Sequence, residues 1–189
     1  MTQDIFLEIK KQSRAARTVS LVLSVFNSQI KNAALCAMAQ AIEESTDEIL
    51  AANTRDLALH RDLSPAMTRR LTMSRESIGR MADGLRTVAA LADPVGAIER
   101  MTKRPNGLLI GRMRIPIGVI GVIFESRPNV IVDIAGIMLK SGNACVLRGG
   151  KEAVHTNSIL ARIMRETAGE NGVPPDYLQF IEHTDHEVV

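Results

Sequence analysis

Two short polar segments each follow an apolar run, and they carry residue types suited to binding an anionic ligand. The first is Glu125-Ser126-Arg127-Pro128-Asn129, and the second is Arg148-Gly149-Gly150 followed by Lys151 and Glu152. Glycine lets the backbone approach a ligand closely, and an arginine guanidinium pairs well with phosphate. A helix N-terminus after each loop would also favour an anion. The pattern predicts a phosphate-bearing ligand at these loops.

A second interpretation of the same residues is purely structural. Gly149 and Gly150 then form a flexible turn from a strand to a helix, and Arg148 is a solvated residue at the strand end. Neither a Gly-x-Gly-x-x-Gly nor a Walker pattern accompanies the loop, so its spacing alone names no particular nucleotide.

The remaining reactive side chains form no catalytic or metal-binding pattern. Cys36 lies in a helical pattern and Cys145 in an apolar run, so we expect both thiols to be reduced, buried and part of the core. His183 and His186 lie near the chain end, beside Asp185, but a zinc site needs about four converging ligands. We therefore assign no catalytic residue and no metal site.

A parallel α/β unit is expected to position the two loops. Apolar runs at 116–124, 144–147 and 178–181 indicate strands, and helical patterns at 130–140 and 156–170 lie between them. The dense β-branched run at 116–124 predicts a fully buried central strand. Ligands of open parallel sheets bind beyond the carboxyl ends of the strands, where both loops lie. Because the sequence ends soon after the third run, we expect about half of a Rossmann-like sheet, truncated.

Residues 1–100 predict a helical region that packs on this sheet, because apolar residues recur there at helical spacing. Ser45 and Glu48 match a capping box, and Ser64 precedes Pro65 at a helix start. Residues 101–115 contain a turn signal at 105–107 and a short alternating segment, which predict short strands, and 116–189 predict a partial α/β domain.

Composition excludes several classes of protein. The 23 basic residues nearly balance the 21 acidic ones, and a net charge of +2 is too small for a dedicated nucleic-acid binder. The longest apolar run is shorter than the roughly 20 residues of a membrane-spanning helix, and the first residues lack a secretory pattern. We expect a globular cytoplasmic protein with no nucleic-acid or membrane partner.

Five segments carry recognisable motifs, namely 116–130 with Glu-Ser-Arg-Pro-Asn, 140–153 with Leu-Arg-Gly-Gly, and 49–57, 91–96 and 105–108. In these segments the chain resembles the γ-glutamyl phosphate reductase family, a branch of the aldehyde dehydrogenase superfamily. The resemblance implies an aldehyde dehydrogenase-like fold and the NADPH-dependent reduction of L-glutamate 5-phosphate to L-glutamate 5-semialdehyde in proline biosynthesis. One departure is Thr68-Arg69-Arg70-Leu71, because the family commonly has an acidic residue before Arg-Leu.

The resemblance also implies roles for the two loops. Arg148 would contact the adenosine ribose and the extra phosphate of NADP, and the first loop would lie near the nicotinamide and the reacting carbonyl. Asn129 and Arg127 match the superfamily's oxyanion-binding asparagine equally well, so that assignment stays open. The implied cofactor-binding residues are Glu125, Ser126, Arg127, Pro128, Asn129, Arg148, Gly149 and Gly150.

The family's nucleophilic cysteine lies later than residue 189, so the resemblance implies a chain that is inactive alone. In the superfamily, chain before the Pro-x-Gly-Val strand joins an arm that pairs between subunits, which assigns 101–115 to oligomerisation. A homo-oligomer or a separate chain that supplies the missing half is then expected. The alternatives are a nucleotide-binding or partner-binding module, or one half of a split enzyme.

Overall fold

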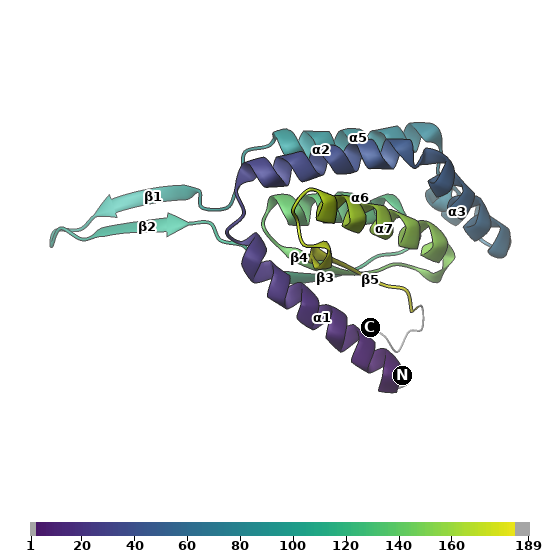
Figure 1. Ribbon diagram of the computed structural model, residues 1–189, viewed down its shortest axis with the longest axis horizontal. Helices are drawn as coiled ribbons and strands as arrows, with labels where there is room; N and C mark the ends of the chain where they lie inside the picture. The colour runs from purple at the N-terminus through teal and green to yellow at the C-terminus, as the bar shows by residue number, and fades with distance from the viewer. Residues whose placement is uncertain (1–2, 184–189) are drawn as a thin grey trace.

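The computed structural model describes residues 3–183, as five helices, a two-stranded hairpin and an α/β unit in that order (Figure 1). The helices of the first part are α1 (Gln3–Leu23), α2 (Ser28–Glu44), α3 (Thr46–Leu59), α4 (Pro65–Leu71) and α5 (Arg75–Ala90). The hairpin is β1 (Ile98–Lys103) and β2 (Leu109–Met113). The α/β unit is β3 (Val119–Ile123), α6 (Asn129–Lys140), β4 (Ala144–Arg148), η1 (Lys151–Ala153), α7 (Val154–Glu170), η2 (Pro175–Tyr177) and β5 (Leu178–Ile181).

The three strands of the α/β unit form a parallel sheet in the order β3-β4-β5. This arrangement confirms the predicted fold class, but one detail of the prediction is wrong. The run at 116–124 does not form a fully buried central strand, because β3 pairs with β4 alone and Ile123 is 60% exposed. The central strand is β4. A β-branched run shows that a segment favours a strand, but it does not specify how many neighbours that strand has.

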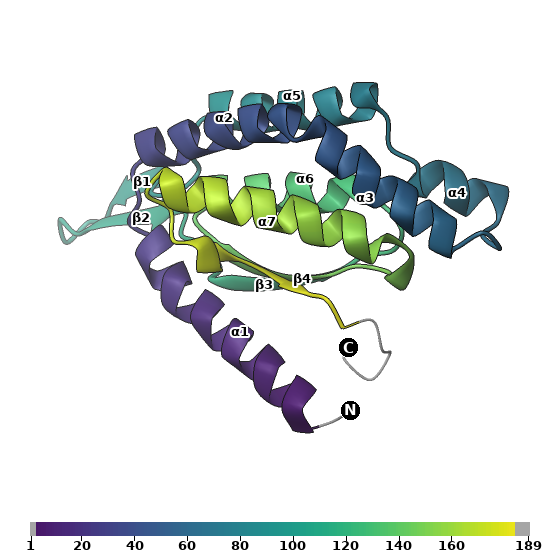
Figure 2. The ribbon, with the colours of Figure 1, turned by 45° about the vertical axis from the view of Figure 1, so that its right-hand side comes forward.

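Helices cover both faces of this sheet. Figure 2 shows α6 and α7 on one face, α2 and α5 as a further layer outside them, and α1 across the opposite face. The core between these layers is aliphatic, with Leu35, Leu85 and Leu139 fully or almost fully buried. Gly136 of α6 lets α5 approach closely, because a Cβ there would lie 2.7 Å from the Leu85 side chain.

Serine side chains begin two of the five helices. Ser64 accepts a hydrogen bond from the Met67 amide and precedes Pro65, as predicted. Ser74 and Ser77 satisfy each other's backbone amides at the start of α5. The predicted capping box at Ser45 is wrong, because its side chain caps nothing. Its backbone amide instead closes α2 by donating to Ala41, so the near-helical Ser45 lacks the extended conformation of an N-cap.

The hairpin projects away from the rest of the chain (Figure 1). Its strands are antiparallel, with Met101 opposite Gly111 and Lys103 opposite Leu109. The first strand begins at Ile98, so the pair starts earlier than the sequence indicated. Within residues 3–183, no helix is both long enough and apolar enough to cross a membrane.

Candidate cofactor site

The fold brings the two predicted loops together at the carboxyl ends of β3 and β4. The Phe124 amide donates to the Arg148 carbonyl oxygen at 3.1 Å, which continues the pairing of the two strands beyond Ile123. The Ser126 hydroxyl, which is almost fully buried, donates to Oε2 of Glu152 at 3.2 Å. Glu152, which spacing did not single out as a site residue, therefore links the loop after β3 to the one after β4.

Both glycines of the second loop have a packing reason that is visible in the structure. A Cβ at Gly149 would clash with the side-chain amide of Asn157 and lie 3.2 Å from the Phe124 ring. A Cβ at Gly150 would lie 2.6 Å from Oε2 of Glu152. Close packing thus favours glycine at the buried position 149, whereas at position 150 only the movable end of the Glu152 side chain lies in the way.

Arg148 is the last residue of β4, half-buried and in register with Ile123 on one side and Ile181 on the other. Asn157, on the first turns of α7, is fully buried, and neither atom of its amide has a hydrogen-bond partner among residues 3–183. The loop therefore places a guanidinium and a glycine turn at the sheet edge, next to the buried amide of Asn157 on α7. The guanidinium suits a phosphate group of a dinucleotide.

The start of α7 is not open to a ligand phosphate, contrary to the expectation from helix N-termini. Asp56 of α3 is fully buried and accepts hydrogen bonds from the His155 and Thr156 amides at 3.1 and 2.8 Å. The Thr156 hydroxyl donates to the same carboxylate at 2.6 Å. The side-chain amide of nearby Asn53 donates to the Leu71 carbonyl and to the Thr156 hydroxyl. The chain itself thus supplies the anion at the start of α7.

Two hollows flank the loop after β3. One, which we call the loop hollow, has a volume of about 310 Å³ and is lined by Met67, Arg70, Phe124, Glu125, Ser126, Arg127 and Val130. The other, the helix hollow, has about 330 Å³ and is lined by Arg70, Thr72, Met73, Ser77, Arg80, Met81, Pro128, Asn129 and Asp133. Arg70 borders both. Spacing gave no reason to select it, because α4 and the loop come together only in the folded chain.

Neither thiol is placed to act at these loops. Cys145 is fully buried in β4, as predicted, and burial raises the pKa of its thiol to about 12. The prediction that Cys36 is buried is wrong, because α2 turns Leu35 and Met38 inward and leaves Cys36 exposed. Successive side chains on a helix are rotated by about 100° around its axis, so a residue next to a core residue in the sequence need not lie on the same face.

Nothing within residues 3–183 groups three or more potential metal ligands. His183 lies 3.0 Å from a carboxylate oxygen of Glu8, whereas His186 and Asp185 lie outside the described residues.

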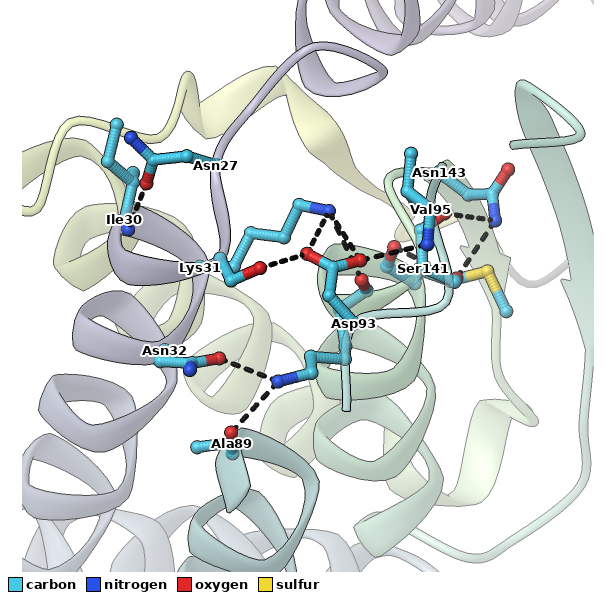
Figure 3. Close-up of polar contacts among 12 residues, drawn as sticks. Asn27, Ile30, Lys31, Asn32, Ala89, Asp93, Val95, Ser141 and Asn143 are labelled. Atoms are coloured by element: carbon cyan, nitrogen blue, oxygen red, sulfur yellow. Dashed lines mark hydrogen bonds and ion pairs between the residues drawn. The ribbon is translucent and has the colours of Figure 1, made fainter. Parts of the chain in front are cut away.

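A separate polar network lies at the amino ends of the strands, away from the loops (Figure 3). Lys31 is fully buried and forms an ion pair with Asp93 at 2.9 Å, and Asp93 also accepts from Ser28 and the Val95 amide. Burial alone would raise the pKa of Asp93, but these hydrogen bonds outweigh it and hold the pKa below its ordinary value.

Lys140 completes the network from the last turn of α6. It donates to Asn32 at 2.7 Å and to the Ala89 carbonyl at 2.8 Å. Burial lowers the pKa of Lys140, and the attraction of Asp93 offsets only part of that effect. The network therefore ties α2, α5 and α6 together beneath the base of the hairpin, which is a structural role.

Comparison with known proteins identifies relatives over almost the whole chain. Residues 7–189 match the model of the aldehyde dehydrogenase family. The γ-glutamyl phosphate reductase of Caldanaerobacter subterraneus is 47% identical over 185 residues, which are 97% of this chain and 45% of the relative. The enzyme of the same name from Moorella thermoacetica is also 47% identical, over 98% of this chain and 45% of its own length. The chain thus spans a little under half the length of these curated relatives.

Solved structures show the same pattern of similarity. The γ-glutamyl phosphate reductase of Thermotoga maritima superposes with a TM-score of 0.92 at 37% identity, over 96% of this chain and 44% of that one. The enzyme of the same name from Saccharomyces cerevisiae gives a TM-score of 0.87 at 32% identity, over 94% of this chain and 47% of that one. An acetylating aldehyde dehydrogenase from Geobacillus thermoglucosidasius gives a TM-score of 0.75 at 18% identity, over 98% of this chain and 38% of that one. At this low identity the similarity shows a shared fold alone.

Proposed function

The chain belongs to the aldehyde dehydrogenase family, and on that premise we propose that it is the cofactor-binding portion of a γ-glutamyl phosphate reductase. The proposed reaction is the NADPH-dependent reduction of L-glutamate 5-phosphate to L-glutamate 5-semialdehyde in proline biosynthesis. The observation that carries the proposal is the meeting of the two loops at the carboxyl ends of β3 and β4. The identity to reductases of this name, over nearly all of the chain, supports it.

Each loop has its own task in this proposal. Arg148 pairs with the 2′-phosphate of NADP, and the partly exposed Gly150, which has no side chain, lets the cofactor approach the sheet edge. The Glu152 carboxylate, already held by Ser126, is a hydrogen-bond acceptor for ribose hydroxyls. When bound, the cofactor supplies the hydride. The remaining predicted residues of the first loop, Glu125 and Pro128, shape the nicotinamide end.

The oxyanion of the reacting carbonyl is better served by Arg127 than by Asn129. The side-chain amide of Asn129 donates to the Asp133 carboxylate at 2.9 Å, so the hydrogen-bonding capacity of this side chain is partly used. The Arg127 side chain has no hydrogen bond or ion pair among residues 3–183 and lines the loop hollow. A cation there favours the developing negative charge.

The chain alone is proposed to bind the cofactor without turnover. The reaction needs an accessible thiolate next to the acyl carbon. The raised pKa and full burial of Cys145 exclude it, and Cys36 on α2 lines neither hollow. We also propose a cytoplasmic location, consistent with two unpaired cysteines.

A titration with NADPH and NADH tests the proposal through the fluorescence of the reduced nicotinamide. Arg148→Glu should weaken NADPH binding by at least about tenfold, because a charge-assisted contact is lost, and should weaken NADH binding less. Arg104→Glu, at the exposed hairpin tip, is the matched control for the change of charge and should leave both affinities unchanged. An equal loss for NADPH and NADH would contradict the 2′-phosphate contact. Absence of binding by the unaltered chain would refute the cofactor site.

The exposed hairpin also supports a homo-oligomer. Leu109 and Ile110 of β2 and Met101 of β1 are each about half or more exposed, although all three are large and apolar. Apolar side chains on a projecting ribbon favour burial against another subunit.

A further inference from the structure

The helix hollow and the loop hollow share Arg70 in their linings, and together these linings carry both signs of charge. The helix hollow is bordered by the ends of α4 and α5 on one side and by α6 on the other. It carries Arg70 and Arg80 on the first side and the Asp133 carboxylate on the second. A site whose lining carries both a guanidinium and a carboxylate suits a ligand that is itself a zwitterion.

Only part of this charge is used within the chain. Arg80 pairs with Glu76 on its own helix. Oδ2 of Asp133 accepts from Asn129, and its other oxygen has no hydrogen bond among residues 3–183. Arg70 makes no hydrogen bond or ion pair with any residue of that range, although many other arginines of the chain are paired. One guanidinium and one carboxylate oxygen thus remain available at the hollow.

The position of Arg70 between the hollows adds a direction to the site. From Arg70, the loop hollow leads to Ser126 and Arg127, which border the proposed reaction centre. A ligand held at Arg70 would extend its other end past the loop that follows β3. This arrangement fits an amino acid whose side chain carries the reacting acyl group, with the charged head in the helix hollow.

We propose that the helix hollow is a subsite for the α-amino acid head of the substrate. Arg70 binds the α-carboxylate through its planar fork, and the free oxygen of Asp133 accepts from the α-ammonium group. The choice of glutamate as ligand rests on the proposed function. The pairing of these two residues with the two charges rests on the hollow itself.

Binding of L-glutamate to the 189-residue chain, followed by amide chemical shifts in NMR, tests the subsite. The expected shifts map to the ends of α4 and α6. Arg70→Gln should weaken binding by at least about tenfold, and Arg69→Gln, its exposed neighbour outside both hollows, should not. Asp133→Asn should weaken L-glutamate but leave glutarate, which has no ammonium group, unaffected. Circular dichroism of each variant checks that it is folded, and Arg70→Lys provides a second change at the same position.

Several outcomes would overturn the subsite. The first is an equal loss of L-glutamate binding in Arg69→Gln and Arg70→Gln, and the second is an equal loss of L-glutamate and glutarate binding in Asp133→Asn. The third is a set of amide shifts that map to other parts of the chain, and the fourth is the absence of saturable shifts up to about 10 mM L-glutamate. NADPH titration of the same proteins separates this failure from that of the proposed function. Retained NADPH binding without glutamate binding refutes the subsite alone, whereas glutamate binding without NADPH binding refutes the cofactor site alone.

Discussion

Replacement of Asp56 is the strongest test of how the second loop is positioned. The carboxylate is fully buried, and it holds the first turn of α7. Only the short helix η1 separates α7 from the loop that contains Gly149 and Gly150. We expect Asp56→Ala to destabilise the chain substantially and to weaken NADPH binding. The matched control is Asp47→Ala on the same helix, because Asp47 is exposed and makes only a surface pair with Arg75.

The magnitude follows from the groups left without a partner. Asp56→Ala strands two backbone amides, those of His155 and Thr156. It also removes the acceptor of the Thr156 hydroxyl, which keeps only the hydrogen bond that it accepts from Asn53. An unsatisfied buried donor costs roughly 1–3 kcal/mol, so the two amides together cost about 4 kcal/mol. Asp56→Asn keeps one acceptor oxygen and should cost about half as much. The exposed pair at Asp47 is worth about 0.5 kcal/mol.

Urea denaturation followed by circular dichroism measures these differences. A loss of about 4 kcal/mol lowers the melting temperature by roughly 10 °C for a chain of this size. A loss below about 1 kcal/mol for Asp56→Ala, or an equal loss for Asp47→Ala, would refute the reasoning that the carboxylate holds the start of α7. NADPH affinity measured well below the melting temperature then reports the effect on the loop separately from stability.

Three further predictions address the polar network, the hairpin and the buried amide. Asp93→Asn should lower the free energy of unfolding by about 3 kcal/mol at pH 7, because it leaves buried Lys31 unpaired. Since the pKa of Asp93 is lowered in the folded chain, the wild type should lose this advantage as the pH falls below about 4. A stability difference that does not depend on pH would contradict the ion pair. Replacing residues 98–113 with a Gly/Ser turn should yield a monomer by light scattering, and an unchanged oligomer would exclude the hairpin as the interface. Asn157→Ala should cost less than about 1 kcal/mol, because removal of a buried amide without a partner offsets the cavity, and a loss above about 2 kcal/mol in urea denaturation would show that the amide is satisfied.

Local sequence signals predicted the elements well where one short segment contains the whole signal. The third strand has the predicted bounds, Leu178 to Ile181, and Ser64 before Pro65 starts a helix as expected. The predictions that failed concern relations between segments. Ser45 lies between two helices that almost run together, so its backbone closes the first helix instead of capping the second. Cys36 lies beside core residues in the sequence but on the outer face of α2.

In the candidate site, too, the sequence predicted what one segment contains but not which segments come together. The two loops could be located from sequence because each directly follows an apolar strand, and strands of a parallel sheet end at a common edge. Arg70 and Asp133 could not be associated, since the hollow between them exists only when α4 and α5 pack beside α6. No periodicity connects residues that far apart.

The sequence by itself determined the secondary structure of the α/β unit, the two loops and the resemblance to a reductase family. These properties depend on local composition and spacing, which act over a few residues. Only the tertiary structure decided that β4 is the central strand, that Asp56 occupies the start of α7, and that Arg70 borders both hollows. The physical reason is that burial and hydrogen-bond partnership depend on which distant segments pack together, and the chain satisfies its buried polar groups across those contacts.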